Sequence, residues 1–164
     1  MEAANAPRIA IRPLVRSDLD AVVAIDSAIE GHSRRAYFER RVAAALRDPG
    51  SHAQFAATDD KGLVGYIQAR MVEGEFGRIE RDLRLEAIGV RRDAQGRGIG
   101  KQLFDTLAQW AGRHAAGELR TQAAWNNHRM LGWLDAMGFE LAPDLVVERS
   151  VGEGYQAERN DALD

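Results

Sequence analysis

Three glycines at alternate positions form the segment of this sequence with the clearest chemical potential. Gly96, Gly98 and Gly100 lie in QGRGIGK (95–101), between an apolar stretch and an amphipathic stretch with helical period. A helix N-terminus has unpaired amides and a partial positive charge, so it attracts anions, and glycine lets a phosphate approach the backbone. The segment therefore predicts a pyrophosphate site, although a glycine turn without a ligand fits the spacing equally well. The basic residues near it are Arg92, Arg97 and Lys101.

Two common phosphate-binding loops do not match these residues. The dinucleotide pattern G-x-G-x-x-G needs a third glycine where Lys101 stands. The nucleoside-triphosphate loop needs a glycine at Gln95 and a hydroxyl side chain at Gln102. A site for another class of nucleotide or phosphate is therefore ranked last among the alternatives.

A different pattern, Gln/Arg-x-x-Gly-x-Gly/Ala, is present as Gln95, Gly98 and Gly100. It resembles the signature of the GNAT superfamily of acetyl-CoA-dependent N-acetyltransferases. The later segment WNNHRMLGWLDAMGFE (125–140) is similar to the Asn-led helix of that family, which ends in Gly-Phe. The resemblance covers the chain from about Arg8 to Val151 and implies an acyl-CoA-dependent N-acyltransferase.

The resemblance implies how the co-substrate acetyl-CoA is held. Its pyrophosphate would lie on the amides of the glycine turn, and its pantetheine arm would pair with the strand before the turn, as an added strand does. Within that strand, Gly89 indicates either a β-bulge or close packing. Asn127 is expected to contact the arm or to cap a helix. The implied cofactor-binding residues are Ile88, Val90, Gln95, Gly96, Arg97, Gly98, Ile99, Gly100, Lys101 and Asn127.

Acetyl transfer to an amine also needs an oxyanion donor and a proton acceptor. The resemblance assigns the main-chain amide of Val90 to the thioester oxygen. Because an alkylamine has a pKa near 10.4, a carboxylate is expected beside it, and Glu86, four positions before Val90, is the best candidate for this base. The alternative is that Glu86 forms an ion pair with a neighbouring arginine on a solvated strand. Weaker candidates, expected to be solvated, are Glu75, Glu80 and Asp82.

One position departs from the pattern of the family. The tyrosine that often protonates the departing thiolate lies four residues before the glycine of Gly-Phe, and this chain has Leu134 there. Water or another tyrosine (Tyr37, Tyr66 or Tyr155) would have to supply the proton. This departure motivates a second hypothesis, a catalytically weak or inactive acyl-CoA-binding regulatory protein.

Apolar periodicity predicts a mixed α/β fold with elements in the order β-α-α-β-β-β-α-β-α-β. The resemblance implies a GNAT-like central, mostly antiparallel sheet flanked by helices. Candidates for lining an acceptor pocket are Arg34, Arg35 and Tyr37, and the alternative is that they form a solvated helix face. Trp110 and Trp125 are expected to pack within the fold rather than to bind substrate. The expected strands are 9–15, a hairpin over 52–72, 83–90, 118–125 and 145–151, and the expected helices run to about 29, over 34–47, from 99 to about 111 and over 128–137.

Composition limits the remaining classes. The 164 residues suit a single acetyltransferase-like domain (1–164), with a core over about 8–151 and flexible tails at 1–7 and 152–164. The net charge of −3 argues against nucleic acid as a partner, and the absence of cysteine excludes disulfides and thiolate metal sites, so no metal is expected. Neither a long apolar run nor a secretory leader is recognised, so a cytoplasmic location without membrane association is expected. The acceptor, a primary amine of a small molecule or a protein, and the oligomeric state stay open, a homodimer included.

Overall fold

The computed structural model describes residues 7–152, and within them one sheet has the strand order β1-β2-β3-β4-β5. The first four strands pair antiparallel in chain order, whereas β5 lies parallel to β4. This mixed sheet confirms the predicted fold class. The strands are β1 (Ala10–Pro13), β2 (His52–Asp59), β3 (Gly62–Glu73), β4 (Arg81–Val90) and β5 (Glu118–Arg120).

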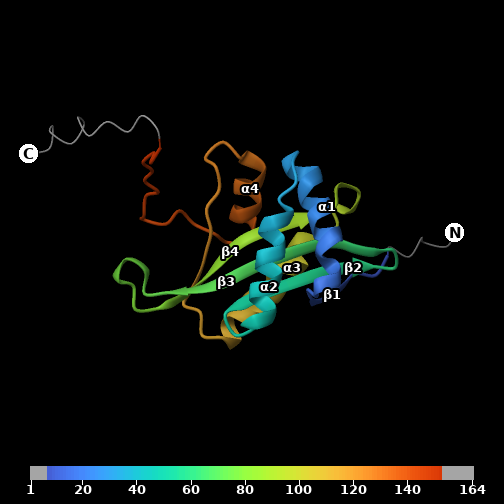
Figure 1. The fold of residues 1–164 in the computed structure, drawn as a ribbon, viewed down its shortest axis with the longest axis horizontal. Helices are drawn as coiled ribbons and strands as arrows, with labels where there is room; N and C mark the ends of the chain where they lie inside the picture. Colours follow the sequence, from blue (N-terminus) through green and yellow to red (C-terminus); the bar gives the residue numbers. More distant parts are fainter. Residues whose placement is uncertain (1–6, 153–164) are drawn as a thin grey trace, which may run out of the picture.

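Helices cover both faces of this sheet (Figure 1). One apolar cluster joins Val22 and Phe38, from α1 and α2, to Tyr66 on β3. A second cluster joins Leu103 and Leu107, from α3, to the opposite face of the sheet, and both leucines are fully buried. The helices are α1 (Leu19–Glu30), α2 (Arg35–Arg47), α3 (Ile99–Arg113) and α4 (His128–Ala136).

A β-bulge interrupts the pairing of β3 with β4. Gln68 is opposite Ala87, but the next residue of β3, Ala69, is opposite Leu85, so Glu86 is the extra residue. Ala87 packs in the cluster below α1 and α2, and Glu86 reaches an arginine of α2, so both side chains lie on that face of the sheet. The bulge thus directs Glu86 toward α2.

Gly89 is not the site of this bulge. It pairs regularly with Tyr66, and a Cβ atom added to it would lie 2.6 Å from the Tyr66 ring. The alternative of close packing is therefore the one that the structure supports, because the phenol ring of Tyr66 occupies the space of the missing side chain.

The end of the described chain differs from the prediction. Strand β5 ends at Arg120 instead of continuing to Trp125, and residues 145–151 form no strand. The side chains of Trp125, Leu145 and Val147 are 84%, 89% and 87% exposed, so the expectation of a packed Trp125 was wrong as well. Just after β5, the Thr121 hydroxyl donates to the Leu85 carbonyl (2.9 Å). This side-chain hydrogen bond replaces the main-chain hydrogen bond that a longer β5 would make there. An alternating apolar run forms a strand only where a neighbouring edge pairs with it.

No helix within residues 7–152 is long and apolar enough to cross a membrane.

Candidate active site

The glycine turn has the backbone conformation that its sequence predicted. After a short 3-10 turn (Arg92–Ala94), Gly96 and Gly98 have φ values of +81° and +75°, in the left-handed region that favours glycine. Gly98 is the N-cap of α3. Within the described residues, the amides of residues 96–101 donate no backbone hydrogen bond. The turn therefore presents a row of unpaired donors at the positive end of a 15-residue helix.

Gly100 is a glycine for a different reason. An added Cβ atom would lie 3.1 Å from the indole Nε1 of Trp133, on α4. The Trp133 ring also meets Phe104 edge-on, with 5.9 Å between ring centroids. The missing side chain of Gly100 thus allows α4 to pack against the first turn of α3.

The side chains around the turn are held by local contacts. The Gln95 side chain donates to the Val90 carbonyl (2.9 Å) and accepts a hydrogen bond from Arg129, at the start of α4. Lys101 pairs with Asp105 at 2.7 Å, and Arg97 makes a long contact with a main-chain carbonyl. Sequence reasoning missed Arg129, whose position two residues after Asn127 was the available signal.

Strand β4 has a free edge beside the turn. The Arg91 amide donates to the Val64 carbonyl on β3 (2.8 Å), so the alternate residues Ile88 and Val90 direct their main-chain groups away from β3. On that side, β5 pairs only with residues 82–84. The unpaired edge is suited to an extended ligand that carries amide groups.

Glu86 lies in a double ion pair. Its two carboxylate oxygens are 2.5 Å from Arg41 Nη2 and 2.6 Å from Arg70 Nε, and the Tyr37 hydroxyl donates to it over 3.4 Å. The Glu86 side chain is only 9% exposed. The ion pair that the alternative expected is therefore present, and the Glu86 carboxylate in it is largely shielded from solvent, whereas its arginine partners are partly exposed.

Glu86, Arg41 and Arg70 line a shallow, half-open pocket. It lies between α2 and the sheet, and β2, β3 and β4 each contribute residues to it. Its polar lining residues are Arg41, His52, Gln54, Gln68, Arg70 and Glu86.

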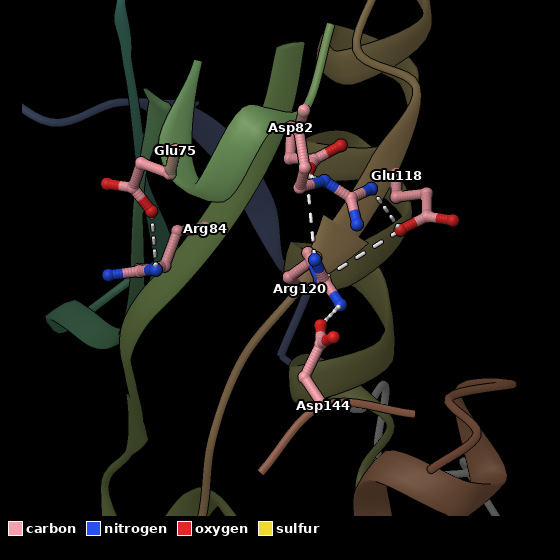
Figure 2. A network of polar contacts seen from close by, with 7 residues as sticks. Glu75, Asp82, Arg84, Glu118, Arg120 and Asp144 are labelled. Atoms are coloured by element: carbon pink, nitrogen blue, oxygen red, sulfur yellow. Dashed lines mark hydrogen bonds and ion pairs between the residues drawn. The ribbon is translucent and has the colours of Figure 1, made fainter. Parts of the chain in front are cut away.

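The weaker carboxylate candidates belong to another part of the molecule. Figure 2 shows Asp82 and Glu75 in ion pairs near the β4–β5 contact. Asp82 is 3% exposed and lies 2.9 Å from Arg78 Nε, so the expectation that it is solvated was wrong. Arg120 of β5 pairs with Asp144 at 2.5 Å and approaches Asp82 at 3.9 Å. This network fastens β5 to β4, and neither carboxylate lines the Glu86 pocket.

The residues considered as proton donors differ in their surroundings. Leu134 is buried in the apolar cluster that joins α3 to the sheet and has no proton to donate. Tyr66 is buried with its hydroxyl 3.3 Å from Asp26, and burial raises the pKa of this phenol. Tyr37 contacts Glu86, and Tyr155 lies outside the described residues. Among the described tyrosines, Tyr37 alone contacts the carboxylate of the pocket.

The arginines proposed for an acceptor pocket have structural partners instead. Arg34 binds the buried Asp26 of α1 through two contacts of 2.5 and 3.0 Å, and this hydrogen-bonded pair raises the pKa of Arg34. Arg35 pairs with the exposed Asp20 at 2.8 Å. Both pairs connect α1 to α2. The basic residues of the pocket are Arg41 and Arg70, which the sequence did not single out.

Asn127 caps α4. Its side-chain oxygen accepts a hydrogen bond from the Met130 amide (3.1 Å), as the helix-cap alternative predicted. The side-chain NH₂ group makes no hydrogen bond to the described residues, so a contact with a ligand through this group is compatible with capping. The described residues contain no group of three His, Asp or Glu side chains arranged to hold a metal ion.

Comparison with known proteins agrees with this geometry. The model of the acetyltransferase (GNAT) family matches residues 19–139. No curated protein matches the chain. An aminoglycoside N-acetyltransferase, AAC(6')-Iy in complex with CoA, superposes with a TM-score of 0.76 at 18% identity, covering 90% of this chain and 98% of the other. A ribosomal-protein-alanine N-acetyltransferase from Brucella melitensis biovar Abortus 2308 has a TM-score of 0.70 at 19% identity, covering 88% and 100%.

The family match spans most of the chain, so the protein belongs to the acetyltransferase (GNAT) family. It is an acyl-CoA-dependent N-acyltransferase by class, with acetyl-CoA as the co-substrate. Fold similarity alone does not identify the acceptor, since a Bacillus halodurans protein described as a transcriptional regulator also superposes, with a TM-score of 0.74 at 16% identity over 87% of this chain and 100% of its own.

Proposed function

We propose that this protein transfers the acetyl group of acetyl-CoA directly to a primary amine. The observation that carries the proposal is the row of unpaired amides at residues 96–101, beside the open edge of β4. The pyrophosphate would bind these amides, and the pantetheine arm would pair with Ile88 and Val90, reaching the NH₂ group of Asn127. The chain has no cysteine that could carry the acetyl group, which favours direct transfer.

In the proposed reaction, the amine nitrogen attacks the thioester carbonyl carbon, a C–N bond forms, and the C–S bond breaks to release CoA thiolate. The amide of Val90 lies on the open edge of β4, where it would stabilise the negative charge that develops on the carbonyl oxygen. Such a donor commonly contributes about 3 kcal/mol to lowering the barrier.

Glu86 is the proposed acceptor of the amine proton. Its carboxylate is ion-paired with Arg41 and Arg70, and it would orient the amine and take up the proton through a water molecule in the pocket. Tyr37, which contacts Glu86, is the proposed source of the proton for the thiolate, with water as the alternative. A thiol has a pKa near 8.5, so the thiolate leaves with little need of an acid.

The test combines calorimetry with product analysis. One CoA is expected to bind per chain, and acetyl-CoA is expected to give equal amounts of free CoA and acetylated amine. Glu86→Gln should lower kcat by about 100-fold and leave the CoA affinity unchanged, because Glu86 lies outside the cofactor turn. Glu118→Gln, which alters an exposed ion pair on β5, is the matched control and should leave kcat unchanged. Absence of CoA binding would exclude the proposal.

The alternative is a CoA-binding regulatory protein with weak or no turnover, which the buried Leu134 favours. It predicts CoA binding without acetylated product for any amine, and a Glu86→Gln variant that behaves as the wild type does.

The similar structures support an amine acceptor and leave its identity open, because one is an aminoglycoside acetyltransferase and another acts on ribosomal-protein alanine. The single acetyltransferase domain, the homodimer and the cytoplasmic location stay predictions. Light scattering of the purified chain would test the homodimer.

A further inference from the structure

The pocket around Glu86 contains more positive than negative charge. Two guanidinium groups, Arg41 and Arg70, face one carboxylate, Glu86, which leaves one net positive charge. Asp48 is close to the rim, but its main-chain oxygen and not its carboxylate contacts the pocket residue His52 (3.0 Å). A cationic ligand is therefore disfavoured, and an anionic group is favoured.

The two arginines retain donors for such a group. Arg41 uses Nη2 for Glu86 and stacks over the Tyr37 ring at 5.2 Å, whereas Arg70 uses Nε. Their side chains are 31% and 35% exposed. Guanidinium groups have five N–H donors in a planar fork that suits carboxylate and phosphate. Each arginine can therefore bind a second anion without leaving Glu86.

Gln68 adds an acceptor to the same pocket. This residue is 4% exposed, and its side-chain NH₂ group donates to the Gln54 side chain (3.2 Å). Its side-chain oxygen is buried and has no hydrogen-bond partner in the described part of the chain. Because a buried unpaired oxygen is unfavourable, this atom requires a donor from a ligand or a water molecule.

The two features together define a complementary ligand. Donors for an anion lie beside two acceptors, Gln68 and Glu86, that suit an ammonium or amine group. The pocket is shallow and half open, so it can receive one end of a ligand but cannot enclose a whole drug-sized molecule.

We infer that the acceptor has an acidic group a few bonds from its reacting amine, as an amino acid does, and that Arg41 and Arg70 bind the acidic group. The inference rests on the proposed acetyl transfer. The amine would face Glu86 and Gln68, and the acidic group would balance the charge of the pocket. Glu86 is four residues from Val90, about 13 Å along the strand, so the amine would lie between the Glu86 carboxylate and the thioester at Val90, with a water molecule relaying its proton to Glu86.

The first experiment compares matched acceptors on the unmodified protein. The twenty protein amino acids, their α-carboxamides and a set of aminophosphonates are tested for acetyl-CoA-dependent acetylation and, with CoA present, for binding by calorimetry. At least one amino acid or aminophosphonate should have a kcat/KM at least 10-fold above that of its uncharged analogue. Preference for phosphonates would identify a phosphate-type acceptor, and preference for amino acids a carboxylate.

The second experiment changes the pocket. Arg41→Gln should raise the KM of the preferred acidic acceptor at least 10-fold more than that of its amide, so the preference disappears, while any loss of kcat from removing a partner of Glu86 should be shared by both acceptors. Arg35→Gln on the same helix, which alters an exposed ion pair, is the matched control and should keep the preference. Retained CoA binding and an unchanged circular dichroism spectrum would show that the variant is folded, and Arg70→Gln provides a second route if it is not.

Each outcome decides one hypothesis. Equal rates for acids and amides, or equal binding of both where no turnover occurs, would overturn the inference and leave the acetyltransferase proposal intact. Failure to bind CoA at all would instead overturn the proposed function, and binding of the acids without CoA would then test the pocket alone.

Discussion

The glycine turn and the Glu86 pocket are constructed in opposite ways. The turn is a continuous segment, 91–101, in which backbone amides are the available groups, while the side chains of Gln95 and Lys101 are held by contacts with residues outside the turn. The pocket joins α2, β2, β3 and β4, and its chemistry resides in side chains that are up to 45 positions apart in the sequence, from Arg41 to Glu86. If the proposed roles hold, the site for the co-substrate depends on backbone groups of one segment, and the site for the acceptor depends on a few side chains that the fold brings together.

The largest expected effect tests the backbone character of the turn. Gly98→Val should weaken CoA binding by about 100-fold, or roughly 2.7 kcal/mol, because valine resists a φ of +75° and its side chain would stand where the phosphate approaches. Calorimetry measures the effect. Gly112→Ala, in the last turn of α3 with open space around it, is the control and should leave affinity unchanged while raising stability slightly. Equal affinity of Gly98→Val and wild type would contradict a backbone site.

The next effect concerns the strand that connects the two regions. Gly89→Ala should lower the free energy of unfolding by about 1–3 kcal/mol, because its Cβ atom would overlap the Tyr66 ring, whose nearest atom is 2.6 Å away. Denaturant unfolding measures this loss. Gly132→Ala on α4 has no atom within 4 Å of the new Cβ and should be neutral or stabilising. A stable Gly89→Ala protein would mean that β4 shifts easily and that Glu86 is not held by it.

The ion pair of Arg12 with Asp18 joins residues that are close in sequence. Its contribution to the free energy of unfolding can be compared with that of the Glu86 ion pairs, whose residues are far apart in sequence. Asp18 accepts two hydrogen bonds from Arg12 (2.7 and 2.8 Å) and one from the Val15 amide, and the Arg12 contact foremost lowers the pKa of Asp18. Asp18→Asn should cost about 1 kcal/mol at pH 7, a value reduced by solvent screening because Arg12 is 41% exposed.

The pH dependence of that cost has a definite sign. Because the folded pKa of Asp18 is lowered, its contribution is complete above the unfolded pKa near 3.9 and disappears as the pH falls through the folded value. Unfolding curves of wild type and Asp18→Asn should therefore converge below about pH 4. A difference that is constant down to pH 2 would exclude the carboxylate as its source.

The smallest effect separates the two roles of Asn127. Asn127→Asp keeps an oxygen that accepts from the Met130 amide but removes the NH₂ group, so stability should be maintained while CoA binding weakens about threefold. Asn127→Ala should also cost about 1 kcal/mol of stability, because the cap is lost. If Asn127→Asp binds CoA as the wild type does, Asn127 acts only as a cap.

Elements whose signals are local in the sequence could be predicted. The hairpin of β2 and β3, the helices α2 to α4 and the left-handed glycines at 96 and 98 lie where periodicity and turn chemistry indicate. Each depends on residues within about one or two turns of each other, so its physical cause is visible in a short stretch of chain.

Signals that need a partner were misinterpreted. The run 145–151 alternates as a strand does, yet it makes no ladder, and Trp125 is exposed. Asp82 in a charged loop resembles a solvated carboxylate, but it is buried between Arg78 and Arg120. A strand requires a neighbouring strand edge to pair with, and a buried charge requires a countercharge. In neither case do the adjacent residues in the sequence reveal the partner.

The linear order of residues was therefore enough to identify the acetyltransferase family, the left-handed glycine turn and Glu86 as a residue of interest, because all three are recognisable in short segments. The position of Glu86 between Arg41 and Arg70, the unpaired oxygen of Gln68 and the charge of the Glu86 pocket emerged only with the folded chain. The reason is the bulge in β4, which turns Glu86 toward α2, and the order of the strands, which brings residues far apart in the sequence to one face of the sheet.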